Sequence, residues 1–101
     1  MEKLALQDIR GCPYRSIGWV ADNLGITKRT VATKIKGIEQ EIERGRYNPY
    51  VIANDGGSVL INIYAFIDYI TYRKRLEDKN MRKYVPEFKP KQVAENCGWE
   101  E

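Results

Sequence analysis

Histidine is absent from the sequence. Its absence removes the most common general base, the most common metal ligand and every serine or cysteine triad that depends on imidazole. Aspartate and glutamate remain, but they are scattered among lysines and arginines, and no pair of them stands at a spacing that indicates a mechanism. We therefore expect a protein that is not an enzyme and that has no catalytic residues, no cofactor and no metal.

Cysteine and long apolar runs are also scarce. Cys12 and Cys97 lie near opposite ends of the chain, without the paired spacing of a zinc site or the density of a secreted disulfide scaffold. We expect both to be free thiols in a reducing compartment. No apolar run approaches the ~20 residues that cross a bilayer, and the N-terminus lacks the pattern of a secretory signal. These features predict a cytoplasmic protein with no membrane partner.

The charge of the chain is distributed unevenly. A net charge of +3 over 101 residues is too small to indicate a nucleic-acid partner by itself. Between Thr27 and Ile38, however, every ionisable residue is basic: Lys28, Arg29, Lys34 and Lys36. A second basic cluster comprises Arg73, Lys74, Arg75, Lys79, Arg82 and Lys83, with Glu77 and Asp78 interrupting it. We interpret Arg73 to Arg75 as a solvated helix end that suits the helix dipole, with a phosphate contact as the alternative.

Hydrophobic spacing predicts two consecutive helices. Ser16 is a good N-cap and Gly25 a good C-terminal residue for a first helix of roughly two turns. Thr27 caps the second helix, which should end at about Glu43 or Arg44. Its apolar residues recur at intervals of three and four: Val31, Ile35, Ile38 and Ile42.

The rest of the chain predicts a hairpin, a third helix and an arm. Apolar runs at 50–53 and 58–61 flank the turn sequence of residues 54–57. A third helix should follow Asn62 to about Leu76, with an apolar face of Ile63, Phe66, Ile67 and Ile70.

Pro86 and Pro90 predict an extended arm over 84–91, followed by one helical turn over 92–96. Residues 3–9 fit a short helix or a strand equally well. We expect one domain over 1–83, and a C-terminal arm over 84–101 that docks on this domain or on a partner.

The junction of the first two helices meets the requirements of a helix-turn-helix. Ala21 is small where the helices cross, and Gly25 permits a positive φ in the tight turn. Ile26 fills the corner between the helices, and Thr27 caps the second one. Because these requirements are met together at fixed offsets, the segment predicts a DNA-reading second helix.

A helical projection places a polar face opposite the apolar one. Arg29, Thr33, Lys36 and Gln40 lie on it, with Lys28, Thr30, Ala32 and Gly37 toward its flanks. Arginine can bind a guanine edge and threonine can contact thymine, while flanking lysines meet phosphates. The candidate DNA-binding residues of this helix are Thr27, Lys28, Arg29, Thr30, Thr33, Lys34, Lys36 and Gln40. The alternative is an ordinary solvated helix face.

The hairpin turn is the second candidate contact. Residues 54–58 could lie along the DNA backbone as a wing, because glycines allow close approach and leave amide groups free for phosphate. The candidate residues are Asn54, Gly56, Gly57 and Ser58. The alternative is a plain turn, since the same residues would be chosen for turn geometry alone.

Residues 16–69 resemble the winged-helix DNA-binding proteins of the MerR and excisionase type. The matching segments are 17–21, 24–31, 45–47 and 61–67. The tail, with Tyr84-Val85-Pro86 and Cys97-Gly98-Trp99, looks like small proteins of phages and mobile elements of Gram-positive bacteria.

This resemblance implies an α+β, mainly α fold: a winged helix-turn-helix with a two-stranded hairpin wing and a C-terminal helix. It implies a partner, double-stranded DNA, and a role as an excisionase-like architectural factor or a transcription regulator. Lys28, Arg29, Thr30 and Thr33 would take the recognition role and residues 54–58 the wing role. An integrase or a second copy of the chain would be a further partner. The alternative function is a phage packaging or replication adaptor that keeps the helix-turn-helix as a scaffold and binds protein through Tyr64, Tyr72 and the tail.

Overall fold

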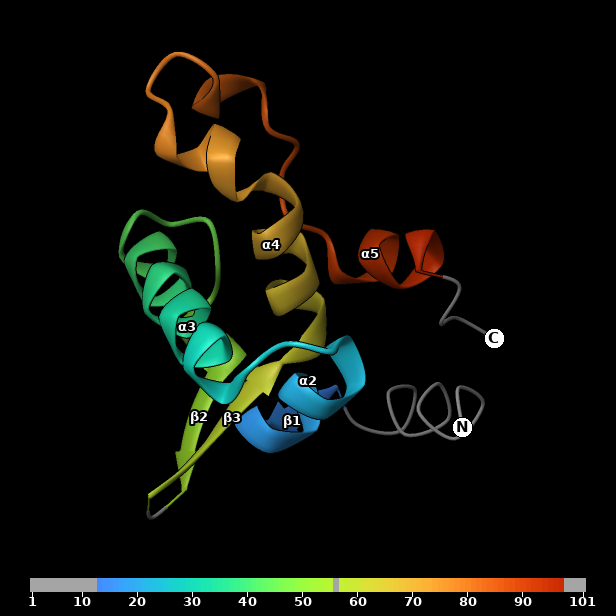
Figure 1. Ribbon diagram of the computed structural model, residues 1–101. Coiled ribbons are helices and arrows are strands. Elements are labelled where there is room, and N and C mark those ends of the chain that lie inside the picture. The colour runs from blue at the N-terminus through green and yellow to red at the C-terminus, as the bar shows by residue number, and fades with distance from the viewer. Residues whose placement is uncertain (1–12, 56, 98–101) are drawn as a thin grey trace.

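The computed structural model describes residues 13–55 and 57–97 (Figure 1). This part of the chain is mainly helical with a small antiparallel sheet, which confirms the α+β, mainly α class. The elements are β1 (Tyr14–Ser16), α2 (Ile17–Leu24), α3 (Lys28–Glu43), β2 (Ile52–Asp55), β3 (Ser58–Asn62), α4 (Ile63–Glu77) and α5 (Pro90–Asn96), with 3-10 turns at Pro49–Val51 and Arg82–Tyr84. The predictions for residues 3–9, Cys12, Gly56 and Trp99 concern positions outside the described residues.

The two predicted helices form with the predicted caps. The Ser16 hydroxyl accepts from the Trp19 amide, and Gly25 ends α2 in the left-handed region at φ 69°. The Thr27 hydroxyl accepts from the Thr30 amide and so starts α3. Capping hydroxyls satisfy amides that have no partner inside the helix, so the two caps fix the starts of α2 at Ile17 and of α3 at Lys28.

The sheet differs from the prediction because it has three strands among the described residues rather than two. β3 lies in the centre, with β2 on one side as the expected hairpin and β1 on the other. In β1, Tyr14 pairs with Asn62 and Ser16 with Leu60. A strand of three residues is too short to show the alternating pattern that reveals a strand in a sequence. It forms here because β3 offers it an edge to pair with.

Two further boundaries were predicted wrongly. Pro49–Val51 forms a 3-10 turn capped by the Asn48 side chain, so β2 begins at Ile52 rather than at Tyr50. The last helix, α5, begins at Pro90 instead of Gln92. Proline has no backbone N–H, and the first position of a helix does not need one. Proline is therefore tolerated at the start of a helix better than in its interior.

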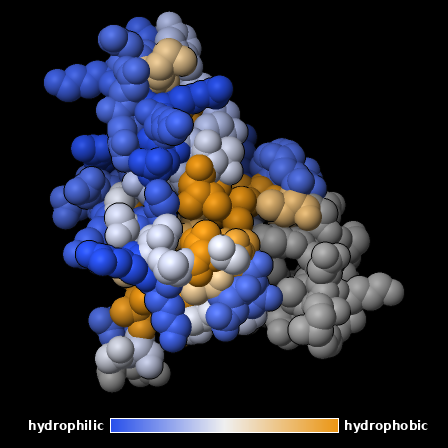
Figure 2. All heavy atoms as spheres, in the orientation of Figure 1, coloured by the Kyte–Doolittle hydropathy of each residue, from blue (hydrophilic) through white to orange (hydrophobic). Residues whose placement is uncertain are grey.

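The buried face of α4 is also rotated from the predicted one. Ile63 and Phe66 are buried as expected, but Ile67 is only half-buried and Ile70 is exposed. Ala65, Asp68, Tyr69 and Leu76 are buried instead. Figure 2 shows an apolar patch in the region of α4. Asp68 and Tyr69 thus lie on the buried face of α4, and the spacing of apolar residues in the sequence does not predict the burial of polar side chains.

The C-terminal segment returns along the domain. Phe88 packs edge-on against Tyr47, with ring centroids 5.1 Å apart, and Ala94 of α5 is buried. Figure 1 shows the chain after α4 turning back along that helix to α5. The described part of the tail therefore lies against its own domain.

Candidate nucleic-acid interface

The turn between α2 and α3 fixes the direction in which α3 leaves. The Ile26 and Gly25 amides both donate to the Ala21 carbonyl, which closes the end of α2. Ala21 is buried, and Ile26 is half-buried against the core. Because Gly25 has open space around its Cα, its role is the positive φ of the turn and not a close contact.

One side of α3 holds the helix in place and the other faces solvent. Val31, Ile35 and Ile38 are buried in the core. The predicted polar face is exposed: Arg29, Thr33, Lys36 and Gln40. Thr27 and Lys28 are exposed too, while Thr30 and Lys34 are half-buried at the flanks. In Figure 2, hydrophilic residues gather on the side of the molecule where α3 lies.

The charge of α3 changes sign along its length. All ionisable residues from Lys28 to Lys36 are basic, whereas Glu39, Glu41 and Glu43 occupy the C-terminal half. The first turn contains no acid, so the positive end of the helix dipole adds to the lysine and arginine charges. The attraction for an anion is therefore strongest at the N-terminal half of α3.

The threonine hydroxyls on this helix are already engaged. Thr33 donates to the Arg29 carbonyl at 3.0 Å, and Thr27 shares a 2.9 Å hydrogen bond with Thr30. In this rotamer Thr33 offers a methyl group and an acceptor to a ligand. The Cε atom of Lys28 lies near Gly18 in the first turn of α2.

The hairpin carries the other predicted contacts. Asn54 and Ser58 are exposed, and Figure 1 shows the hairpin reaching beyond the helices. Gly57 has φ 103°, which favours glycine, and is exposed. Its amide donates to the Asn54 side chain at 3.4 Å, a long hydrogen bond, so the expectation of a free amide at Gly57 is wrong in this conformation.

Sequence reasoning missed a buried polar cluster beside the hairpin. Arg46 and Asp68 form a bidentate ion pair with side chains only 8% and 4% exposed, and the Tyr47 hydroxyl donates to Asp68 at 2.6 Å. Arg46 also donates to the Pro86 carbonyl. Burial and the hydrogen bond to Asp68 raise the pKa of Tyr47, so it remains a donor at neutral pH. The cluster therefore connects three segments: the residues that precede the hairpin, α4 and the tail.

A second missed residue is Glu41 on α3. Its side chain is buried and binds both Arg82 and Arg44. Burial by itself raises the pKa of Glu41, but the hydrogen bonds and charges of the two arginines outweigh it, so the pKa lies below its ordinary value. The sequence signal for a buried, paired carboxylate was the place of Glu41 beside the apolar residues Ile38 and Ile42 on the helix.

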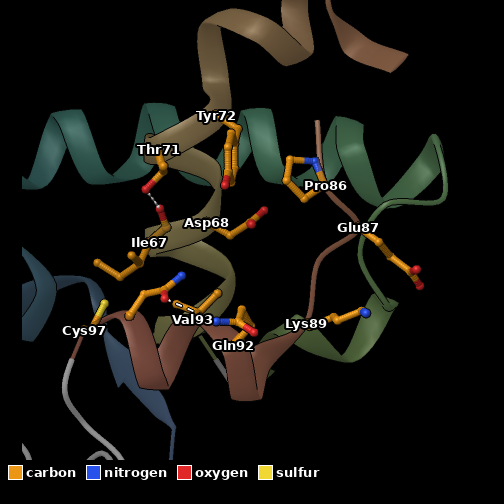
Figure 3. A pocket seen from close by; sticks show the side chains of 11 residues that line it. Ile67, Asp68, Thr71, Tyr72, Pro86, Glu87, Lys89, Gln92, Val93 and Cys97 are labelled. Carbon is orange, nitrogen blue, oxygen red and sulfur yellow. Dashed lines mark hydrogen bonds between the residues drawn. The ribbon is translucent and has the colours of Figure 1, made fainter. Parts of the chain in front are cut away.

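A cavity of about 290 Å³ lies between α4 and the chain from Pro86 to Cys97. Figure 3 shows the side chains that line it. The Asp68 carboxylate on its wall is already bound by Arg46 and Tyr47. The Thr71 hydroxyl donates to the Ile67 carbonyl, and burial raises the pKa of the Cys97 thiol. Within residues 13–55 and 57–97, no three side chains of the metal-binding types come together.

Comparisons with known proteins found no counterpart: no family model, no curated protein and no solved structure matches the chain. Among the described residues, no helix combines the length and apolar character required to cross a membrane.

Proposed function

We propose that this protein is a winged helix-turn-helix that binds double-stranded DNA, with the N-terminal half of α3 in the major groove. The observation that carries the proposal is the exposed face of Arg29, Thr33 and Lys36 on a helix whose opposite face is anchored in the core. A rigid helix with such a face can enter the major groove, whose width accepts one α-helix.

The charge pattern of α3 suggests which part of the helix would contact DNA. The acidic C-terminal half would be repelled by phosphates, so the first two to three turns would make the contacts. Arg29 would bind a base edge, because arginine can donate two hydrogen bonds to guanine. Lys28 and Lys34, toward the sides of the helix, would meet the backbone. Asn54, Gly57 and Ser58 would place the hairpin against the adjacent backbone or minor groove.

Two roles share this binding chemistry. An excisionase-like factor should bind directly repeated sites beside an attachment site and bend them, with an integrase as its partner. A transcription regulator should bind a palindrome as a symmetric dimer. Footprinting on the bound DNA separates the two, because it shows whether the half-sites are direct repeats or a palindrome.

The adaptor function has less support. Tyr64 and Tyr72 are both half-buried, and the tail packs on its own domain through Phe88 and Ala94. A protein partner that bound through Tyr64 or Tyr72 would therefore meet side chains that are already partly covered.

The direct test is Arg29→Ala. We expect it to weaken binding to a duplex selected from a random-sequence library by roughly 1–3 kcal/mol, because one base contact is lost. Fluorescence anisotropy on protein shown to be folded by circular dichroism measures the change. Glu39→Ala, an exposed position on the same helix, is the control and should not weaken binding. An unchanged isotherm for Arg29→Ala would exclude its proposed role, and failure of the selection to enrich any duplex would refute specific DNA binding.

A further inference from the structure

A second segment of the chain has the same net charge as the basic N-terminal half of α3. Residues 73–83 contain six Lys and Arg against two Asp and Glu, a local net charge of +4, whereas the whole chain has +3. The rest of the chain is therefore slightly acidic. The structure gathers these charges at the last turn of α4 and the 3-10 turn Arg82–Tyr84.

Internal ion pairs explain two of the six cations. Arg82 binds the buried Glu41, and Arg73 lies 3.7 Å from Glu77. The remaining four are exposed and form no ion pair with any residue that the structure describes: Lys74, Arg75, Lys79 and Lys83. We name these four residues the basic cap. The helix dipole accounts for cations in the last turn of α4, but Lys79 and Lys83 lie beyond that turn.

The basic cap lies far from the face of α3 already described. Figure 1 shows the end of α4 and the following turn on the opposite side of the molecule from the hairpin and from the start of α3. The longest dimension of the molecule is 40 Å, about the length of one turn of DNA. Glu39 and Glu43, both exposed, occupy the C-terminal half of α3 between these two basic regions.

We propose that the basic cap is a second nucleic-acid-binding surface, which contacts the phosphate backbone of a DNA duplex without reading its sequence. Four cations on long, flexible side chains suit a row of phosphates, whose binding is driven by release of counterions. Tyr84 is 68% exposed with the Lys83 ammonium over its ring, so it lies in the same surface as a further contact.

A duplex fits this surface better than an acidic protein does. A protein interface has an apolar core from which charged residues are depleted. Here the large exposed hydrophobic side chains of the same segments are Ile70, Met81 and Tyr84, and the four cap residues are all charged and exposed.

This inference goes beyond the proposed role of α3 and depends on that role only for the choice of DNA as ligand. If both regions bind, the protein can hold two segments of DNA or one bent segment, because two basic surfaces on opposite sides of a molecule cannot both lie flat on a straight duplex. Each surface alone would bind DNA more weakly than the two together.

The test measures the salt dependence of binding to a duplex of mixed sequence. Two variants remove two cap charges each, Lys74→Gln/Arg75→Gln and Lys79→Gln/Lys83→Gln. Lys89→Gln/Lys91→Gln is the matched control, because it removes the same charge from exposed lysines at the start of α5. Glutamine removes the charge but keeps a polar side chain at these exposed positions, so all three proteins should fold, which circular dichroism and thermal melting verify.

We expect each cap variant to lower the slope of log K against log salt by about 1–2, since each lost phosphate contact contributes about 0.9. The control variant should retain the slope of the unmodified protein. A cap variant with the slope of the control would overturn the inference. Binding to poly-glutamate at least as tight as binding to the duplex would also overturn it, in favour of an acidic protein partner.

A parallel variant, Arg29→Ala/Lys36→Ala, separates this inference from the proposed function. If it loses binding to the selected duplex while the cap variants behave as the control, the function of α3 stands and the cap proposal falls. If the cap variants alone lose binding, the cap proposal stands and the role of α3 falls. Absence of binding to any duplex at low salt overturns both.

Discussion

Gly37 shows how a single residue can decide the approach of two helices. Glycine inside a helix is destabilising relative to alanine by about 1 kcal/mol, so its presence in the middle of α3 needs a reason. The reason is Tyr69 of α4, which is buried and whose hydroxyl and ring lie where a Gly37 side chain would begin. Gly37 therefore belongs to the contact between α3 and α4, although the helical projection placed it toward the polar side.

This contact gives a prediction for stability. We expect Gly37→Ala to destabilise the protein by about 1–3 kcal/mol, because the strain of overpacking exceeds the gain in helix propensity. Urea denaturation followed by circular dichroism measures the change. Glu39→Ala, exposed two residues later, should be neutral or slightly stabilising. A Gly37→Ala protein more stable than the original would show that Tyr69 moves aside without loss.

At the scale of elements, Glu41 fastens the C-terminal half of α3 to the 3-10 turn Arg82–Tyr84. Arg82 donates to both carboxylate oxygens of Glu41 and also to the Leu76 carbonyl at the end of α4. Arg44, one turn further along the chain, donates to the same carboxylate. The position of α3 therefore depends on a charge as well as on its apolar face.

The lowered pKa of Glu41 predicts a pH dependence. A carboxyl group whose pKa is lower in the folded state contributes stability above its unfolded pKa, and this contribution is lost as the pH falls through the folded value. Below the ordinary pKa of 4.5, the stability of the protein should therefore decrease as Glu41 becomes protonated. Glu41→Gln removes this component and should cost about 1–3 kcal/mol at pH 7.

Urea denaturation of the protein and of Glu41→Gln at pH 7 and pH 3 measures this effect. We expect the difference in unfolding free energy between them to shrink at pH 3. Glu39→Gln is the control at an exposed position of the same helix and should show little difference at either pH. A difference that stays constant with pH would contradict the assignment.

At the scale of the whole molecule, Arg46, Asp68 and Tyr47 join segments that are distant in the sequence. Asp68 is buried in α4, and its carboxylate receives hydrogen bonds from Arg46 and Tyr47 at the approach to the hairpin. Arg46 donates in addition to Pro86 of the tail. A buried ion pair does not by itself indicate a gain in stability, but removing one partner leaves a buried charge uncompensated.

We therefore expect Arg46→Met to destabilise the protein by about 3–5 kcal/mol. The double variant Arg46→Met/Asp68→Asn should recover much of this loss, because asparagine is neutral and keeps an oxygen that accepts from Tyr47. Thermal or urea denaturation of the single and double variants measures the recovery. If the double variant is less stable than Arg46→Met alone, the loss does not come from the uncompensated charge.

Much of the α2 to α4 region was predictable because its signals are local. Ser16 and Thr27 cap the helices that the sequence assigned to them, and Gly25 ends α2 in the predicted conformation. The polar face of α3 was predictable for the same reason: helical geometry alone places Arg29, Thr33 and Lys36 together. Their role in DNA binding stays a prediction.

Tertiary structure decided what depends on distant partners. β1 exists because β3 supplies an edge, and Asp68 is buried because Arg46 and Tyr47 reach it from another segment. Gly37 is required because Tyr69 crosses it, and four cations form one cap because α4 ends beside a tight turn. Caps and helical faces follow from neighbours along the chain, whereas pairing, burial of charge and clustering on a surface follow only from neighbours in space.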